Sequence, residues 1–385
     1  VMPFALDPAN ATYAERDGCT YPVYLDPGPP VLLGESSETQ YEWQAGFAHV
    51  AVWQTHLSIN DSVVIDISPR ACGNINAYPS NPDYLYGIEE GGDFGTGYAL
   101  NPVTGMPYPA QEVLRGDYTR VLAEFWADGP DSETPPGHWF TILNGVTEHP
   151  QFDWKWEGKG ESLPPNAYLA RAYRLLGGTM HDAAIAAWSV KGYYDFVRPI
   201  TAIRYMLSKG QSTLPGVPSY DSEGVPLIEG VFELVAEGDP ILETEPEALG
   251  TVKTYRWLAG DAGSDGEFGW TTGCAWRPFQ MPTFVTPPFA GYVSGHSTYS
   301  RAAADALSFA TGSRYFPGGV GAFEVEANSF LAFESGPSEP FELQWATYQD
   351  AADQCALSRI WGGIHPPMDD IRGRGMGVQV AQLAI

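Results

Sequence analysis

The chain has 385 residues, 44% of them hydrophobic and 13% aromatic, which is enough for a substantial core in one large domain or two ordinary ones. With 47 acidic and 20 basic residues it carries a formal net charge of −27, which argues against nucleic acid or anionic lipid as a partner, because phosphate groups bind basic surfaces. No run of eighteen or more apolar residues occurs, so no membrane span is predicted.

The first hundred or so residues are rich in Pro, Gly, Asn, Asp and Tyr. A capping-box-like sequence at Ser37 predicts one helix that runs to about Leu57. A short apolar stretch, 62–68, predicts a strand, and the rest reads as ordered loop. We therefore expect residues 1–108 to form a loop-rich segment that packs on a catalytic domain of residues 109–385.

Beyond residue 108 the pattern becomes helical, and no internal repeat is evident. The fold class that follows is all-α, a helical bundle with long loops that meet at one end. The predicted helices cover 113–127, 138–146, 165–176, 181–207, 245–262, 296–311, 323–335, 344–361 and 367 onward.

A first pair of cations stands in the predicted helix 181–207. Lys191 and Arg198 are seven residues apart, so two helical turns would place both on one face, and Pro199 would then end or bend the helix. Two such cations usually form only a solvated face. That interpretation is awkward here, because Trp188 and the apolar run 183–187 precede Lys191, and cations on a buried face need an anion.

A second segment, Ser294-Gly295-His296, directly precedes the predicted helix 296–311. Free N–H groups and the helix dipole favour an anion at such a helix start. The simpler alternatives are that Ser294 is an ordinary N-cap and that His296 is a capping or core histidine.

A third segment follows the helix that ends near Arg359. The glycine pair 362–363 breaks this helix, and His365 with two prolines opens the next one, which has Asp369 in its first turn. Taken alone, His365 could be a loop residue and Asp369 a charge favoured by the helix dipole. The chain has only seven histidines, so it is unlikely that both His296 and His365 stand in these segments by chance. His138 and His181, outside these segments, are expected to be structural.

Together these segments resemble the superfamily that joins vanadium-dependent haloperoxidases to type 2 phosphatidic acid phosphatases and bacterial acid phosphatases. Val293 stands where the family has proline. The similarity extends from about Gln111 to the end, and the blocks 123–129, 132–139 and 182–188 resemble the bacterial haloperoxidases. The matching signature is Lys191, six residues and Arg198-Pro199; Ser294-Gly295-His296; and Ser358-Arg359, five residues, His365, three residues and Asp369.

The resemblance implies a role for each catalytic candidate. His365 would be the protein ligand of vanadium, with its other ring nitrogen held by Asp369 or by a backbone carbonyl. His296 would be the acid–base catalyst, and Lys191 would polarise bound peroxide. The groups that would bind the oxygens of vanadate are Lys191, Arg198, Ser294, Gly295 and Arg359.

Vanadate and phosphate share charge and geometry, so the signature alone leaves two activities open. In a haloperoxidase, hydrogen peroxide and a halide, bromide by preference, would give hypohalous acid that halogenates a small organic acceptor. In a phosphatase, His365 would attack phosphorus and form a phosphohistidine. The resemblance places Trp188 and Phe289 at the halide pocket, which favours the haloperoxidase. A non-catalytic oxyanion-binding protein is the third alternative.

Cellular context is less strongly marked. The acidic composition fits an exported protein, periplasmic or extracellular, and the absence of an initiator methionine or signal peptide suggests a processed chain. Residues 261–267 resemble a calcium loop without its full ligand pattern, so a solvated turn is favoured over structural calcium. A homo-oligomer is kept open, because relatives often assemble. Cys19, Cys72, Cys274 and Cys355 could form one or two disulfides, or Cys355 could be a buried free thiol.

Overall fold

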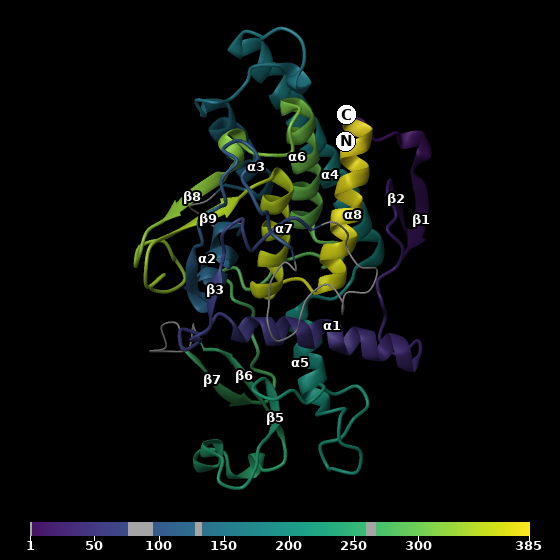
Figure 1. The fold of residues 1–385 in the computed structure, drawn as a ribbon. Coiled ribbons are helices and arrows are strands. Elements are labelled where there is room, and N and C mark those ends of the chain that lie inside the picture. The colour runs from purple at the N-terminus through teal and green to yellow at the C-terminus, as the bar shows by residue number, and fades with distance from the viewer. Residues whose placement is uncertain (1, 76–94, 128–132, 259–266) are drawn as a thin grey trace.

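A computed structural model describes residues 2–75, 95–127, 133–258 and 267–385 of the chain. Figure 1 shows upright helices that form a bundle, with helix α1 lying across its lower end. The helices are α1 Ser37–Thr55, α2 Arg115–Phe125, α3 Pro135–Glu148, α4 Pro165–Tyr194, α5 Pro199–Lys209, α6 Gly295–Thr311, α7 Tyr348–Trp361 and α8 Pro367–Ala384. The helical-bundle fold class is thus confirmed.

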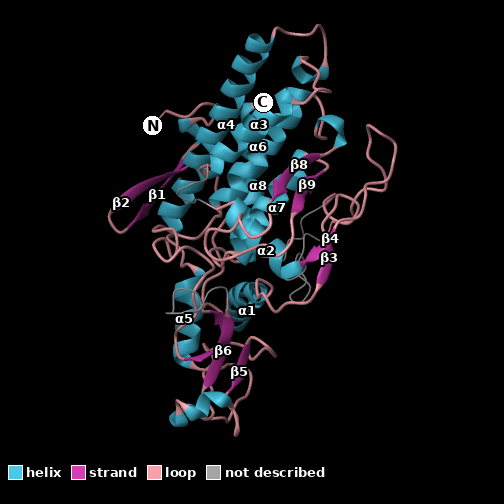
Figure 2. Cartoon of the chain, turned by 90° about the vertical axis from the view of Figure 1, so that its left-hand side faces the viewer, coloured by secondary structure: helices cyan, strands magenta, loops and turns pink. Residues whose placement is uncertain are grey.

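The strands are short and lie at the periphery of the bundle. Their bounds are β1 Thr12–Arg16, β2 Cys19–Val23, β3 Val64–Asp66, β4 Glu112–Leu114, β5 Phe232–Leu234, β6 Val252–Trp257, β7 Phe268–Thr272, β8 Gly321–Val325 and β9 Phe341–Trp345. They form antiparallel pairs β1–β2, β3–β4 and β8–β9 and one three-stranded sheet, β5–β6–β7. This sheet and α5 form the part of the molecule below α1 (Figure 2).

Helix α6 is the central element of the bundle and packs against α4, α7 and α8. Alanines dominate its buried positions, and two glycines of α8 face it. A Cβ on Gly377 would lie 2.6 Å from the carbonyl oxygen of Thr298, and one on Gly373 would lie 2.7 Å from that of Ser294. Only glycine permits backbones to approach this closely. The contact places the start of α6 against the middle of α8.

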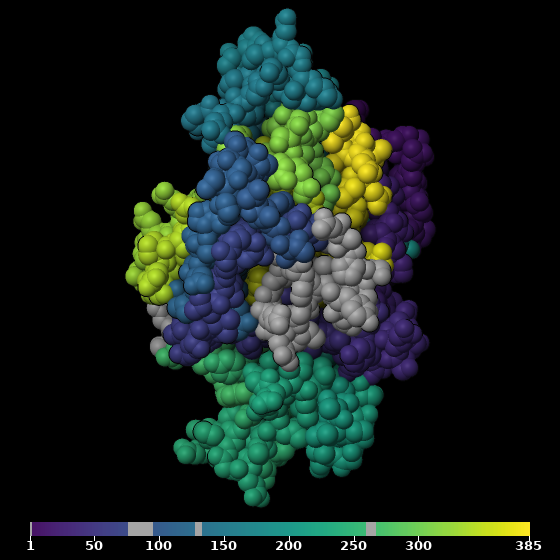
Figure 3. Space-filling view, in the orientation of Figure 1, coloured from purple at the N-terminus to yellow at the C-terminus, as the bar shows by residue number. Residues whose placement is uncertain are grey.

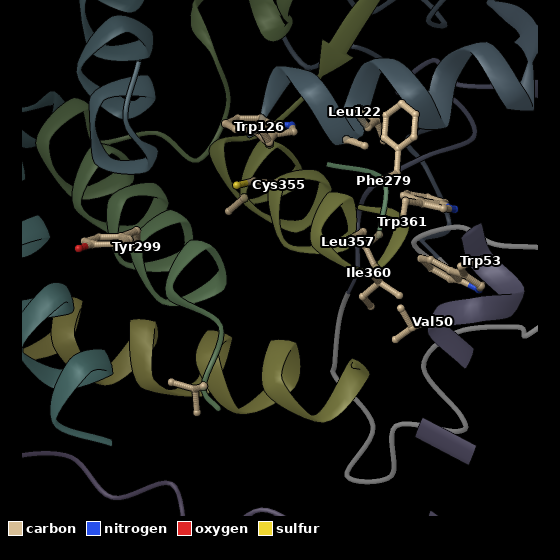
Figure 4. Packing of buried hydrophobic residues seen from close by; sticks show 14 of the residues in the cluster. Val50, Trp53, Leu122, Trp126, Phe279, Tyr299, Cys355, Leu357, Ile360 and Trp361 are labelled. Carbon is tan, nitrogen blue, oxygen red and sulfur yellow. The ribbon is translucent and has the colours of Figure 1, made fainter. Parts of the chain in front are cut away.

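Helix α1 is joined to the bundle by a buried aromatic contact. The rings of Trp53 on α1 and Trp361 on α7 stack with centroids 4.5 Å apart, and neither is exposed by more than 3%. Figure 4 shows Val50 beside Trp53, facing Ile360 and Trp361. Aromatic stacking of this kind adds about 0.5–1.5 kcal/mol to the gain from burial. The contact fixes α1 against the end of α7, close to where the third sequence segment begins.

The start of the N-terminal segment, drawn in purple, lies on the outer flank of the bundle (Figure 3). Its strand β2 contacts α4. Helix α1 and strand β3 are close to their predicted ranges. The division of the chain at residue 108 stays a prediction. No helix among the described residues has the length and apolar character needed to cross a membrane.

Four predicted helices are wrong in type or extent. Residues 245–262 contain a short helical turn followed by strand β6, whose alternating burial is that of a β-strand and not of a helix. Residues 323–335 hold the end of β8 and a loop. The predicted helices 165–176 and 181–207 are instead one continuous helix, α4, and a separate helix, α5. The first error arose because aromatic and polar residues in β6 also fit a helical period.

None of the four cysteines forms a disulfide, so the alternative with one or two disulfides is wrong. Cys355 is buried on α7, with the hydroxyl oxygen of Ser300 3.0 Å from its sulfur, as the alternative reading had it. Most of the calcium-like loop 261–267 lies outside the described residues. Among those that are described, no group of three or more His, Cys, Asp or Glu side chains could hold a metal ion.

Buried His49 on α1 makes stability depend on pH. Its ring is 2% exposed, and burial lowers its pKa from 6.5 to about 3. The unfolded chain therefore takes up a proton below pH 6.5 that the folded chain refuses, so stability present above this pH is lost as the pH falls. The loss is about 1.4 kcal/mol for each pH unit. In urea unfolding, the free energy of unfolding of His49→Leu should decrease less than that of wild type as the pH falls below 6.5. An identical pH dependence of the two proteins would contradict this assignment.

Candidate active site

The loop after α4 brings Lys191 and Arg198 together in a way that the sequence did not predict. Lys191 lies in the last turn of α4, which ends at Tyr194, and Asp195 then adopts a left-handed conformation with φ 45° and ψ 46°. Arg198 is the N-cap residue of α5, held extended because a proline follows it. The expectation that both cations share one helix face is therefore wrong. The chain turns back between them, and Pro199 begins a helix instead of ending one.

The N-terminal hairpin supports this loop from outside. The guanidinium of Arg16 donates to two carbonyl oxygens in the last turn of α4 and pairs with Asp195 at 2.7 Å. Further along α4, the buried carboxylate of Asp182 accepts hydrogen bonds from the backbone N–H groups of residues 4–6. The start of the chain is thus anchored to the helix that carries Lys191. No motif in residues 1–28 indicated this support.

The ammonium of Lys191 is buried and only partly satisfied by the backbone. Its Nζ donates to the carbonyl oxygens of residues 290 and 291 at 2.8 and 2.7 Å. An ammonium has three donors, so one remains for a ligand. The nitrogen also lies 5.7 Å from the ring centroid of Trp188 and 5.4 Å from that of Phe289. Burial lowers the pKa of Lys191 well below its usual value, and the charge of Arg198 lowers it further.

Arg198 is fixed by the backbone but keeps one nitrogen unpartnered. Its Nε donates to the carbonyl oxygen of Phe289 at 2.9 Å, and its Nη1 donates to that of Ile364 at 2.9 Å. Nη2 is buried without a hydrogen-bond partner. Burial lowers the pKa of Arg198 to about 10, which still leaves the guanidinium charged at neutral pH. A buried, charged donor of this kind favours binding of an anion.

The hydrogen bonds of His365 fix its tautomer. Nη1 of Arg198 lies 3.0 Å from Nε2, and since arginine only donates, Nε2 must accept and carry no proton. The proton is therefore on Nδ1, which donates to Oδ2 of Asp369 at 2.7 Å. Burial lowers the pKa of His365 and raises that of Asp369 to about 7. The sequence left open whether Asp369 or a backbone carbonyl would accept the hydrogen bond from this histidine, and in the structure the acceptor is the carboxylate of Asp369.

The start of α6 carries the second segment. The hydroxyl of Ser294 accepts the N–H of Ser297 at 3.3 Å, as an ordinary N-cap does, and Ser294 is not among the described residues that line the cavity. Its part in binding an oxyanion stays a prediction. Gly295 does line the cavity, and a Cβ there would lie 3.1 Å from the ring of Trp188. The glycine lets this ring lie directly against the helix start.

The ring of His296 borders the cavity with one free nitrogen. The residue is partly exposed, while its Nε2 is buried and has no hydrogen-bond partner. Burial lowers its pKa well below 6.5, the charge of Arg359 acts in the same direction, and a hydrogen bond with the Trp126 backbone opposes both. A neutral imidazole with an unsatisfied nitrogen can accept or deliver a proton at that atom.

Arg359, in the last turn of α7, is the third cation of the site. Its guanidinium is 1% exposed. Nε donates to the hydroxyl of Ser358 at 3.0 Å, and Nη2 donates to the carbonyl oxygen of Ala123 on α2 at 2.7 Å. The residue therefore ties α7 to α2 while its charge reaches the cavity. The predicted helix end, glycine break and new helix from Pro367 are confirmed in this region.

These side chains meet at one cavity of about 320 Å³. Among the described residues that line it, none is acidic, although the chain as a whole carries −27. Trp188 and Phe289, both 41% exposed, stand at its border with ring centroids 5.2 Å apart. The lining residues are Thr134, Pro135, Pro136, Trp188, Lys191, Arg198, Gln280, Phe284, Pro287, Phe289, Gly295, His296, Tyr299, Arg359, Ile364 and His365.

Several of the cavity residues were not foreseen. Gln280 is buried, and its amide nitrogen donates to the carbonyl oxygen of Gly362 at 3.1 Å, beside the helix break that precedes His365. Tyr299, one turn into α6, borders the ring of Trp188. Gln280 belongs to no motif or periodic pattern, so no signal in the sequence marks it. His181, by contrast, is exposed and bonds the carbonyl oxygen of Met2.

The fold and site together define a helical protein with a cavity lined by three cations and two imidazoles, called the oxyanion cavity after the ligand we propose for it. Comparison with known families agrees with this fold. Residues 171–221 and 250–385 match the family model of the VCPO second helical-bundle domain. The matched part of the chain contains all three sequence segments, so the resemblance to the vanadium haloperoxidases is confirmed. No curated protein gave a significant match.

Among solved structures, the chain is similar to a bacterial vanadium-dependent chloroperoxidase in its holo form, with 18% identity and a TM-score of 0.46 over 70% of this chain and 43% of that one. Its apo form gives the same identity and score over 44% of that chain. A bacterial vanadium-dependent iodoperoxidase gives 20% identity and a TM-score of 0.38, with 69% and 43% covered. The chain thus spans less than half the length of these proteins.

Proposed function

We propose that the protein is a vanadium-dependent haloperoxidase, which uses hydrogen peroxide to oxidise a halide, bromide by preference, to hypohalous acid that halogenates organic molecules. One observation carries this proposal. Three buried cations and two neutral imidazoles converge on a single cavity, with no acidic residue among its described lining. Such an arrangement is costly unless an anion is bound.

Vanadate fits the groups that the cavity presents. Nη2 of Arg198 is a buried donor without a partner, and Lys191 has one donor to spare. Nε2 of His365 is unprotonated, as a metal ligand must be, and Asp369 holds its other nitrogen. We infer that His365 would bind the metal while Lys191, Arg198, Arg359 and the N–H of Gly295 would hold the oxygens. When bound, vanadate supplies a Lewis acid that activates hydrogen peroxide without changing its own oxidation state.

Side chains of the protein supply the other steps of the proposed reaction. Lys191 donates a hydrogen bond to the bound oxidant and draws electron density from it. His296 accepts and returns a proton at Nε2, because its pKa keeps the ring neutral. Trp188 and Phe289 give the halide a partly dry, polarisable surface next to the cations. Bromide loses less hydration energy than chloride on entering such a surface, which favours bromide over chloride.

A phosphatase would use the same cations, with Nε2 of His365 as nucleophile. The two aromatic rings beside Lys191 favour the haloperoxidase, since they offer nothing to the polar oxygens of a phosphate ester. The test is bromination of phenol red by peroxide and bromide, with and without added orthovanadate, beside hydrolysis of para-nitrophenyl phosphate. Vanadate-dependent bromination is the expected result. Hydrolysis without bromination would establish the phosphatase. The absence of both activities would favour a non-catalytic oxyanion-binding protein.

His296→Ala should keep vanadate and lose most of the bromination rate. The alanine removes a proton carrier whose contribution is typically about 10²- to 10⁴-fold in rate, but no ligand of the metal. Vanadium content after gel filtration and the bromination rate, measured on the same preparation, check both parts. A variant that brominates at the wild-type rate would show that His296 is not the acid–base group.

Two further properties remain proposals that rest on composition and on relatives. Export to the periplasm or the medium is proposed from the acidic composition, and fractionation of the producing cells tests it. A homo-oligomer is proposed because relatives often assemble, and sedimentation of the purified chain tests it.

A further inference from the structure

The start of α3 borders a second cavity, distinct from the oxyanion cavity. Thr134 and the two prolines after it line the oxyanion cavity, whereas Glu133 and His138 line the second one. The second cavity also has a volume of about 320 Å³, within the range typical of small-molecule sites. Figure 1 and Figure 2 both show α3 beside the β8–β9 hairpin, which forms the facing wall.

One face of α3 lines this cavity from end to end. Its lining residues recur at intervals of three and four, the spacing of one helical face. Helix α3 packs mainly against α6 and α4, which leaves this face to the cavity. In the last turn of α3 stands Gly145, where an added Cβ would meet no atom within 4 Å. The lining residues from α3 and its flanks are Glu133, His138, Thr141, Ile142, Gly145, Val146 and His149.

The facing wall is made of aromatic rings. Phe125 lies with its ring centroid 4.7 Å from Phe323 and 6.1 Å from Trp345, and Phe316 lies 6.2 Å from Trp345. All four line the cavity. Flat rings around a small space favour a planar aromatic ligand, because offset and edge-to-face contacts add to the gain from burial.

Polar groups stand at the two ends of this helix face. The Nδ1 of His149 accepts the N–H of Gln151 at 3.1 Å, so its proton is on Nε2, which can donate. At the other end, the carboxylate of Glu133 accepts the hydroxyl of Thr141 at 3.3 Å and lies 3.7 Å from Nε2 of His138, and a carboxylate has lone pairs enough to accept a further hydrogen bond. Both can bond a hydroxyl group, while the carboxylate and the strongly negative chain would repel an organic anion.

We propose that the cavity between α3 and the β8–β9 hairpin binds an uncharged, hydroxylated aromatic compound. Binding at this site needs neither vanadate nor halide, so this proposal can be tested independently of the chemistry proposed for the oxyanion cavity.

Titration calorimetry with 2-naphthol tests this proposal on the full chain. Gly145→Leu places a side chain in the open space and should weaken binding at least tenfold. Gly375→Leu is the matched control, because Gly375 is also an exposed helical glycine whose added Cβ would meet nothing within 4 Å. Leucine is the better helix former at both positions, so both variants should fold. Wild type and Gly375→Leu should bind equally.

Three results would overturn the proposal. Wild type could fail to bind 2-naphthol, or Gly145→Leu could bind it as tightly as Gly375→Leu does. Saturation with orthovanadate could also displace 2-naphthol, which would place the aromatic compound in the oxyanion cavity. The expected result is an affinity for 2-naphthol that orthovanadate leaves unchanged.

Discussion

Replacing His365 with alanine is expected to abolish vanadate retention. The imidazole offers the unprotonated Nε2 that would bind the metal, and the hydrogen bond from Nδ1 to Asp369 fixes its direction. Loss of a group that only orients a ligand typically costs 10- to 100-fold in metal affinity, so loss of the ligand itself should cost more than about 100-fold. Equilibrium dialysis against orthovanadate, with vanadium measured by atomic spectroscopy, gives the affinity directly.

The control for this experiment is His181→Ala. His181 is an exposed histidine on α4, away from the oxyanion cavity, and its Nε2 lies 3.0 Å from the carbonyl oxygen of Met2. The His181→Ala variant should bind vanadate with the affinity of the wild type. Wild-type occupancy in His365→Ala would refute the assignment of the metal ligand. Circular dichroism of both variants separates a lost site from a lost fold.

Arg374→Met should produce the largest loss of stability. Arg374 on α8 is 1% exposed and pairs with Asp370 at 2.6 Å and with Asp353 of α7 at 3.0 Å. The carboxylate of Asp370 also accepts the hydroxyl of Ser297 at 2.8 Å, next to His296. Removing the guanidinium leaves two carboxylates buried without their cation. Breaking a buried ion pair in this way typically costs about 3–5 kcal/mol in the free energy of unfolding.

Arg372→Met is the matched control, two residues earlier on the same helix and exposed. An exposed charge of this kind should change the free energy of unfolding by no more than about 0.5 kcal/mol. Urea titration of both variants and wild type at neutral pH measures the difference. Equal midpoints for the two variants would mean that the buried network contributes little to stability.

The candidate site was largely predictable because its chemistry is local in sequence. Ser294 caps α6 and the two residues after it begin the helix, while His365 follows a glycine break, so each position could be inferred from start and stop signals. The spatial relation between Lys191 and Arg198 could not be inferred from the sequence. A left-handed residue, Asp195, ends the helix between them, and aspartate adopts that conformation too rarely for spacing alone to reveal it.

The errors in the fold have a similar origin. Strand β6 exists because it pairs with β5 and β7 on either side, and such pairing is not visible in a single stretch of sequence. Gln280 reaches the cavity through contact with the glycine break after α7, some eighty positions away in the chain. Local patterns predict helix ends well, but not partners brought together by the tertiary fold.

The anchoring of residues 4–6 by Asp182 bears on the order in which the protein assembles during synthesis. The first strands leave the ribosome long before α4 exists, and they have no helix to dock on until that helix emerges. The cavity beside the loop after α4 also needs α6, α7 and the segment before α8, all of which are synthesised later than α4. The cavity can therefore form only after these segments have been made, and a fragment that ends before α6 lacks His296, Arg359 and His365.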